Sequence, residues 1–113
     1  MSPLSRRSFL RHSAIAATAG TTNTGAIDAL PELVDLAAGE GLWLHVDAAY
    51  GGAAKLSERL AGEVVGLERA DSITIDPHKW FFQAYDIGGL LVRDGERVSN
   101  APDVARFLVE GEP

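Results

Sequence analysis

Short apolar runs of strand length alternate with stretches of helical spacing along this chain, and this alternation most constrains its fold. The four apolar runs are residues 14–19, 42–47, 71–75 and 89–93. The three helical stretches are residues 31–39, 53–61 and 102–110. Strands that alternate with helices favour a mostly parallel sheet with helices packed on its faces. The sequence therefore predicts an α/β fold.

Polar residues stand at the ends of three of these predicted strands. They form three groups: Thr21 and Thr22; His45 and Asp47; and Asp76, His78 and Lys79. The carboxyl ends of parallel strands meet at one edge of a sheet, where ligands bind in folds of this class. We therefore expect the three groups to contribute to one site.

Lys79 has the most distinctive chemistry in these groups. It precedes Trp80, Phe81 and Phe82, and apolar surroundings favour the neutral form of an amine. A neutral amine is the nucleophile that condenses with an aldehyde. The alternative is a lysine that extends from a strand end into solvent, which is the commoner role of this residue type.

Asp47 ends an apolar strand, where its carboxylate needs a compensating partner. One candidate is a protonated pyridine nitrogen, which Coulomb attraction at about 4 Å stabilises by about 4 kcal/mol at an effective dielectric constant of roughly 20. A protonated pyridine allows pyridoxal phosphate to accept electrons. Asp47 could instead cap the turn that follows it. A third hypothesis is a metal-dependent hydrolase site made of His45, Asp47, Asp76 and His78.

The composition excludes several other classes of protein. The chain has no cysteine, so disulfide scaffolds and thiolate metal sites are excluded. Its net charge of −6 disfavours nucleic acid as a partner. No apolar run approaches the roughly 20 residues of a membrane-spanning helix. We therefore expect neither nucleic acid nor a membrane as a partner.

The beginning of the chain differs from the rest in charge. All 16 acidic residues lie at or after Asp28, whereas the preceding residues carry three arginines. Arg6-Arg7 followed by Ser-Phe-Leu is typical of a twin-arginine export signal. We therefore divide the chain into a basic leader, residues 1–13, and a folded region, residues 14–113. Export by this signal is the alternative to our expectation of a cytoplasmic protein.

Five blocks of the sequence occur in the order and at the spacing of a known enzyme family. The blocks are Ala17–Thr22, Gly25–Asp28, His45–Gly52, Ala70–Thr74 and Asp76–Trp80. They resemble the group II pyridoxal-phosphate-dependent amino-acid decarboxylases, which include the aromatic-amino-acid and glutamate decarboxylases. The resemblance covers residues 14–95. It implies part of the large domain of the aspartate-aminotransferase-like fold, fold type I, in which strand 89–93 runs antiparallel to its neighbours.

The resemblance also implies a role for each of five residues. Lys79 would be the catalytic lysine that binds pyridoxal 5′-phosphate covalently, and Asp47 would bond the pyridine nitrogen. Ala49 would pack its methyl group on one face of the ring. His78 would lie beside the cofactor near its phosphate, and Thr22 would contribute a hydroxyl group nearby.

The implied activity is the removal of the carboxylate of an L-amino acid as carbon dioxide, in a whole enzyme that is a homodimer. Asp76 is left out of the cofactor-binding residues because a carboxylate repels phosphate. The family's phosphate-binding loop, second ring-stacking residue and small domain cannot be located in the sequence. We therefore expect a fragment that is inactive alone, and a non-catalytic remnant is the other alternative.

Overall fold

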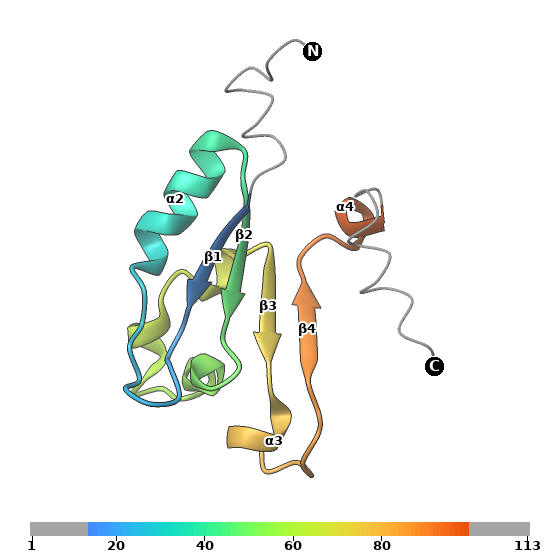
Figure 1. Ribbon diagram of the computed structural model, residues 1–113. Coiled ribbons are helices and arrows are strands. Elements are labelled where there is room, and N and C mark those ends of the chain that lie inside the picture. Colours follow the sequence, from blue (N-terminus) through green and yellow to red (C-terminus); the bar gives the residue numbers. More distant parts are fainter. Residues whose placement is uncertain (1–13, 100–113) are drawn as a thin grey trace.

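The computed structural model describes residues 14–99, and its centre is a four-stranded sheet (Figure 1). The strands, in their order across the sheet, are β1 (Ala14–Thr18), β2 (Trp43–Asp47), β3 (Ser72–Ile75) and β4 (Gly89–Val92). All four predicted strands are confirmed. The expected leader, residues 1–13, and the predicted helix over residues 102–110 lie outside the described residues.

The sheet is mixed, as the resemblance implies. β1, β2 and β3 run parallel, and β4 pairs antiparallel with β3. In the parallel part, Thr18 pairs with Asp47, which in turn pairs with Thr74. The three parallel strands therefore end at one level, and the connections that leave them begin at the same edge, the lower one in Figure 1.

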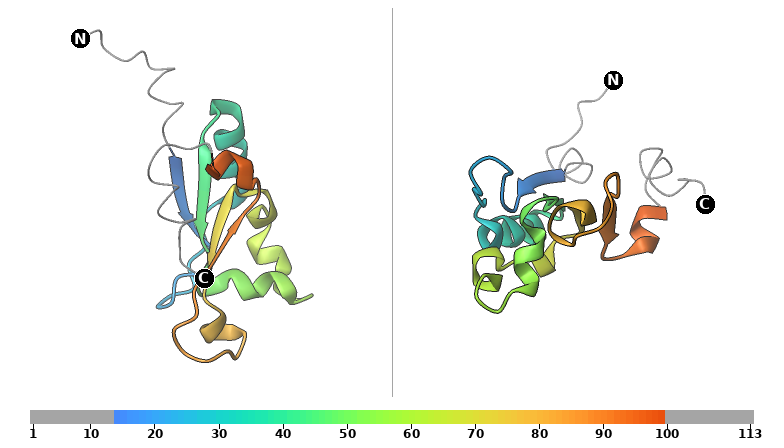
Figure 2. Two further views of the ribbon diagram at one scale, coloured as in Figure 1. Left: turned by 90° about the vertical axis from the view of Figure 1, so that its right-hand side faces the viewer. Right: turned by 90° about the horizontal axis from the view of Figure 1, so that it is seen from below.

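Helix α2 (Leu30–Glu40) packs on one face of the sheet, on the same side as the segment after β2 (Figure 2). Gly41 ends the helix in the left-handed conformation, with a φ of 67°. Apolar side chains of the helix and the strands form one buried cluster, which includes Leu30, Val34, Ala37, Leu44 and Val46. In the part of the chain that the structure describes, no helix is long and apolar enough to cross a membrane.

The predicted helix over residues 53–61 is wrong. The segment after β2 instead contains three short 3₁₀ helices, η1 (Gly51–Leu56), η2 (Ala61–Val64) and η3 (Leu67–Arg69). A continuous amphipathic helix would turn an apolar stripe toward the core, but Leu56 and Leu60 are exposed. The segment contributes Val64 and Leu67 to the buried cluster instead.

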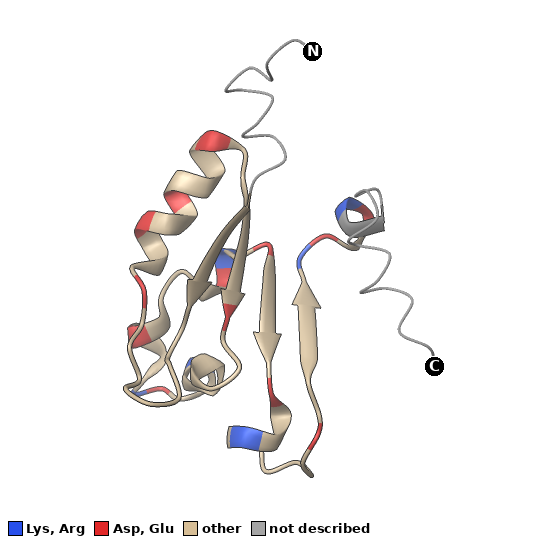
Figure 3. Cartoon of the chain, in the orientation of Figure 1, with Lys and Arg blue, Asp and Glu red and all other residues tan. Residues whose placement is uncertain are grey.

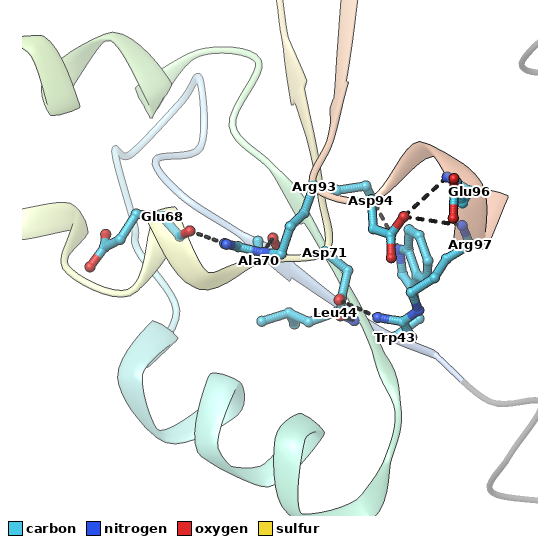
Figure 4. A network of polar contacts seen from close by, with 10 residues as sticks. Trp43, Leu44, Glu68, Ala70, Asp71, Arg93, Asp94, Glu96 and Arg97 are labelled. Atoms are coloured by element: carbon cyan, nitrogen blue, oxygen red, sulfur yellow. Dashed lines mark hydrogen bonds and ion pairs between the residues drawn. The ribbon is translucent and has the colours of Figure 1, made fainter.

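A network around Asp71 links the elements at the opposite end of the strands (Figure 4). Asp71 precedes β3, accepts a hydrogen bond from the backbone N–H of Leu44 at 2.8 Å, and pairs with Arg97 at 3.0 Å. Arg97 lies in α4 (Gly95–Ser99), and its guanidinium carbon is 5.0 Å from the ring centre of Trp43. The network therefore connects β2, β3 and α4 at the end of the sheet away from the three connections.

Candidate functional site

Two backbone hydrogen bonds extend the pairing of β2 and β3 beyond the strands themselves. The Ala48 N–H donates to the Thr74 carbonyl at 3.0 Å, and the Asp76 N–H donates to the Ala49 carbonyl at 3.4 Å. Figure 3 shows acidic segments at the ends of both strands, followed by a basic segment in the short helix after β3. The side chains that follow β2 and β3 are thus held on neighbouring connections at one edge.

Asp47 is the last residue of β2 and is exposed. Its Oδ1 atom accepts a hydrogen bond from the backbone N–H of Ala49 at 3.1 Å, so the carboxylate does cap the turn that follows it. Among residues 14–99, the Oδ2 atom has no hydrogen-bond partner. The turn fixes the carboxylate and leaves one oxygen able to bind a cation.

Lys79 lies in α3 (Pro77–Trp80), the short helix that follows β3. Its Nζ atom is 3.1 Å from Oδ2 of Asp76, and the two side chains are 28% and 22% exposed. The expected apolar surroundings of this amine are wrong, because Trp80 is half exposed and Phe82 is 92% exposed. A carboxylate, rather than aromatic rings, is the immediate partner of the amine.

Asp76, which the sequence analysis placed in this group but left out of the cofactor-binding residues, is the partner of Lys79. Its Oδ2 atom contacts Lys79 and lies 4.0 Å from Nε2 of His78. The Nδ1 atom of His78 donates to the Ile87 carbonyl at 2.8 Å, and its ring packs edge-on against Tyr85. The sequence did carry a signal for the contact between Asp76 and Lys79. The two residues are three positions apart around a proline that begins a helical turn, and residues three apart on a helix are neighbours.

Thr22 is exposed and lies in the connection after β1. Because β1 is next to β2 in the sheet, this connection neighbours the one after β2. Two glycines allow these connections to touch. A Cβ atom on Gly51 would lie 2.1 Å from the carbonyl oxygen of Ala19, and Gly20 has a φ of 84°. The contact sets the position of the Thr22 connection relative to Asp47.

The metal-site hypothesis is wrong for the described residues. Both ring nitrogens of His45 are hydrogen-bonded, Nδ1 to Ser72 at 2.8 Å and Nε2 to Thr74 at 3.0 Å. Across residues 14–99, no three histidine, cysteine, aspartate or glutamate side chains gather closely enough to hold a metal ion. The edge of the sheet therefore presents an amine and carboxylates, and these do not form a set of metal ligands.

Known proteins resemble this chain over most of its length. Residues 12–109 match the pyridoxal-dependent decarboxylase conserved domain. The chain is 52% identical over 85 residues to the aromatic-L-amino-acid decarboxylase of Bacillus atrophaeus, a match that covers 75% of this chain and 18% of that protein. It is 56% identical over 81 residues to the L-2,4-diaminobutyrate decarboxylase of Rhizobium meliloti (strain 1021), covering 72% and 16% respectively.

A solved structure gives the same result. The crystal structure of Oryza sativa TDC with PLP superimposes with a TM-score of 0.67 and 42% identity, over 74% of this chain and 18% of that one. The chain therefore spans less than a fifth of the length of these relatives. Because the family's domain matches most of the chain, we conclude that the chain belongs to the pyridoxal-dependent decarboxylase family.

Proposed function

We propose that this chain carries the cofactor-binding lysine and aspartate of a pyridoxal-phosphate-dependent amino-acid decarboxylase. The observation that carries the proposal is that Asp47 and Lys79 follow adjacent parallel strands at the same edge of the sheet. An amine and a carboxylate on neighbouring connections are the two groups that the aldehyde and the ring nitrogen of this cofactor need.

The residues present fit pyridoxal phosphate in their chemistry. Lys79 supplies an amine for its aldehyde, and the open Oδ2 atom of Asp47 suits a protonated ring nitrogen. The methyl group of Ala49, two residues after Asp47, is small enough for a planar ring to pack on it. His78 and Thr22 are proposed as further contacts, from α3 and from the connection after β1.

When bound, pyridoxal phosphate supplies a ring that accepts the electron pair left as carbon dioxide departs. Asp47 keeps the ring nitrogen protonated by its negative charge. Asp76 holds the Lys79 ammonium at 3.1 Å and releases it when the amine reacts. His78 is fixed by its hydrogen bond to the Ile87 carbonyl, and its Nε2 atom lies 4.0 Å from the Asp76 carboxylate that holds the amine.

Covalent labelling tests the assignment of Lys79. The chain contains two lysines, Lys55 and Lys79. In the whole protein, incubation with pyridoxal phosphate and reduction with borohydride should fix the cofactor on Lys79 rather than Lys55, as read by peptide mass spectrometry. Lys79→Ala should abolish the label, whereas Lys55→Ala, which removes only a surface pair with Glu68, should retain it. A label that persists undiminished in Lys79→Ala would contradict the assignment.

The proposed activity belongs to the whole protein, and its proposed substrate is an L-amino acid. The names of the relatives, an aromatic-L-amino-acid and an L-2,4-diaminobutyrate decarboxylase, support this reaction class. The whole protein should release carbon dioxide from an amino acid in the presence of pyridoxal phosphate, and Lys79→Ala should not. Release that is independent of the cofactor would refute the reaction class.

We propose further that the whole protein is a cytoplasmic homodimer. The exposed aromatic side chains of Trp80 and Phe82, next to Lys79, support an interface at this edge. Light scattering should give the mass of two chains, and a monomer would contradict the proposal.

The cytoplasm is where the cofactor would be inserted, so a reporter fused to residues 1–26 should stay inside the cell. Export that depends on Arg6 and Arg7 would show the opposite.

A further inference from the structure

Tyr50 lies in the turn between β2 and η1, and the residues on both sides of it are held against the end of β3. The Ala49 carbonyl accepts the backbone N–H of Asp76 at 3.4 Å. Gly52 approaches Ile75 so closely that a Cβ atom on the glycine would lie 3.3 Å from Cγ1 of the isoleucine. The backbone that carries Tyr50 is therefore fixed relative to β3, and the tyrosine is partly buried.

The ring of Tyr50 packs against the ring of Trp80, the last residue of α3. The two ring centres are 5.5 Å apart and the ring planes meet at 64°, which is the edge-to-face arrangement that aromatic side chains favour. Trp80 is half exposed, so Tyr50 covers only part of its surface. The contact connects the turn after β2 with the helix after β3 (Figure 1), at the edge of the sheet where Asp47 and Lys79 lie.

Helix α3 depends on contacts of this kind because it is only four residues long. A single helical turn is unfavourable on its own, and Asp76, which precedes α3, makes no capping hydrogen bond with its side chain. Directly before Lys79, the imidazole of His78 is held by the loop between α3 and β4. Directly after Lys79, Trp80 packs on Tyr50. The backbone that carries the lysine is thus held on both sides by other segments.

We propose that Tyr50 is a positioning residue for Lys79: through its contact with Trp80, it fixes the rotation of α3 and hence the direction from which the lysine amine meets the aldehyde of the cofactor. This inference rests on the proposed function of Lys79. Lys79 and Trp80 are adjacent residues of one helical turn, so a rotation of α3 that releases Trp80 also turns Lys79. Tyr50 touches no reacting atom and acts through Trp80.

Two substitutions of Tyr50 in the whole protein test this role. Tyr50→Leu removes the ring and leaves an apolar side chain, whereas Tyr50→Phe keeps the ring contact. In Tyr50→Leu, the rate at which pyridoxal phosphate and borohydride label Lys79 should fall about three- to tenfold, the range that one aromatic contact contributes. In Tyr50→Phe it should stay within roughly twofold of the parent rate. Labelling of Lys55 is the internal reference, because a variant that merely unfolds exposes both lysines. Circular dichroism of the bound cofactor, which reports how its ring is held, should weaken in Tyr50→Leu and be restored in Tyr50→Phe.

Two variants on the side of α3 make the test independent of the folding of Tyr50→Leu. Trp80→Leu should reduce labelling of Lys79 by the same factor, and the double variant should label no more slowly than either single variant, because both remove one contact. Phe82→Leu is the matched control, since Phe82 is 92% exposed and also lies close to Lys79 in the sequence. It should label within roughly twofold of the parent rate. An equal loss in Phe82→Leu would assign the effect to the exposed aromatic surface and refute the role of Tyr50.

The outcomes distinguish this inference from the proposed function. Labelling of Lys79 at the parent rate in Tyr50→Leu, with unchanged circular dichroism of the cofactor, would overturn the role of Tyr50 and leave the proposed function standing. Losses that add in the double variant would also overturn it, because the two rings would then act separately. If Tyr50→Leu does not fold, labelling at the parent rate in Trp80→Leu refutes the inference. Failure of the parent protein to label Lys79 would overturn both.

Discussion

Replacing Asp71 by alanine should destabilise the chain through one identifiable hydrogen bond. The Leu44 N–H that donates to Asp71 is 2.8 Å away and belongs to a residue that is 1% exposed, so water cannot replace the lost acceptor. A hydrogen bond to a charged group contributes about 1.5–3 kcal/mol. The ion pair with the half-exposed Arg97 adds about 0.2–1 kcal/mol. The free energy of unfolding should therefore fall by about 2–4 kcal/mol.

The matched variant Asp71→Asn isolates the two contributions. Its amide oxygen still accepts the Leu44 N–H, so it should lose the ion pair and the charge on the acceptor but leave no N–H unsatisfied, a loss of about 1–2 kcal/mol. Urea unfolding of the full chain, followed by circular dichroism and tryptophan fluorescence, measures both values. A double-mutant cycle with Arg97→Ala should give a coupling of about 0.5–1 kcal/mol with Asp71→Ala. Equal losses for the alanine and asparagine variants would refute the argument from the unsatisfied N–H.

Two further predictions concern the segment after β2. Gly51→Ala should destabilise the chain by about 1–3 kcal/mol and reduce the proposed labelling of Lys79, because its Cβ would meet the Ala19 carbonyl. Gly62→Ala, where nothing lies within 4 Å, is the control, and equal effects in urea would contradict the prediction. The hydrogen bond from Lys55 lowers the pKa of Glu68 below its ordinary value of 4.5, so its stabilisation is present above that pH and lost as the pH falls through the lowered pKa. Lys55→Met should remove this pH dependence, at a cost of up to about 1 kcal/mol for so exposed a pair; an unchanged acid unfolding curve would count against it.

The strands could be predicted from the sequence because each of them is a short apolar run whose end is marked by polar residues. The pairing of Thr18, Asp47 and Thr74 then follows from parallel packing. Helix α2 was equally predictable, since a proline at its start and a glycine at its end bound an apolar stripe. Local pattern and tertiary packing agree in these elements.

The segment after β2 was not predictable in the same way. Its leucines at 56 and 60 have helical spacing but point into solvent, so the pattern described no buried face. The prediction of apolar surroundings for the Lys79 amine was wrong for a similar reason. Trp80 follows it in the same short helix, where neighbouring side chains point in different directions, and Phe82 lies beyond the end of that helix. The residue three positions earlier, Asp76, reaches the amine instead.

The ion pair between Asp76 and Lys79 has a consequence for selectivity toward reagents. An ammonium group held by a carboxylate has no lone pair with which to attack a carbonyl. Aldehydes in solution that reach Lys79 before a cofactor binds therefore meet an amine that is not nucleophilic. For the amine to react, Asp76 must find another partner, and the nearest described one is His78, whose Nε2 atom lies 4.0 Å from that carboxylate. Under the proposed function, a compound that reacts with Lys79 must therefore first displace or compensate the Asp76 carboxylate.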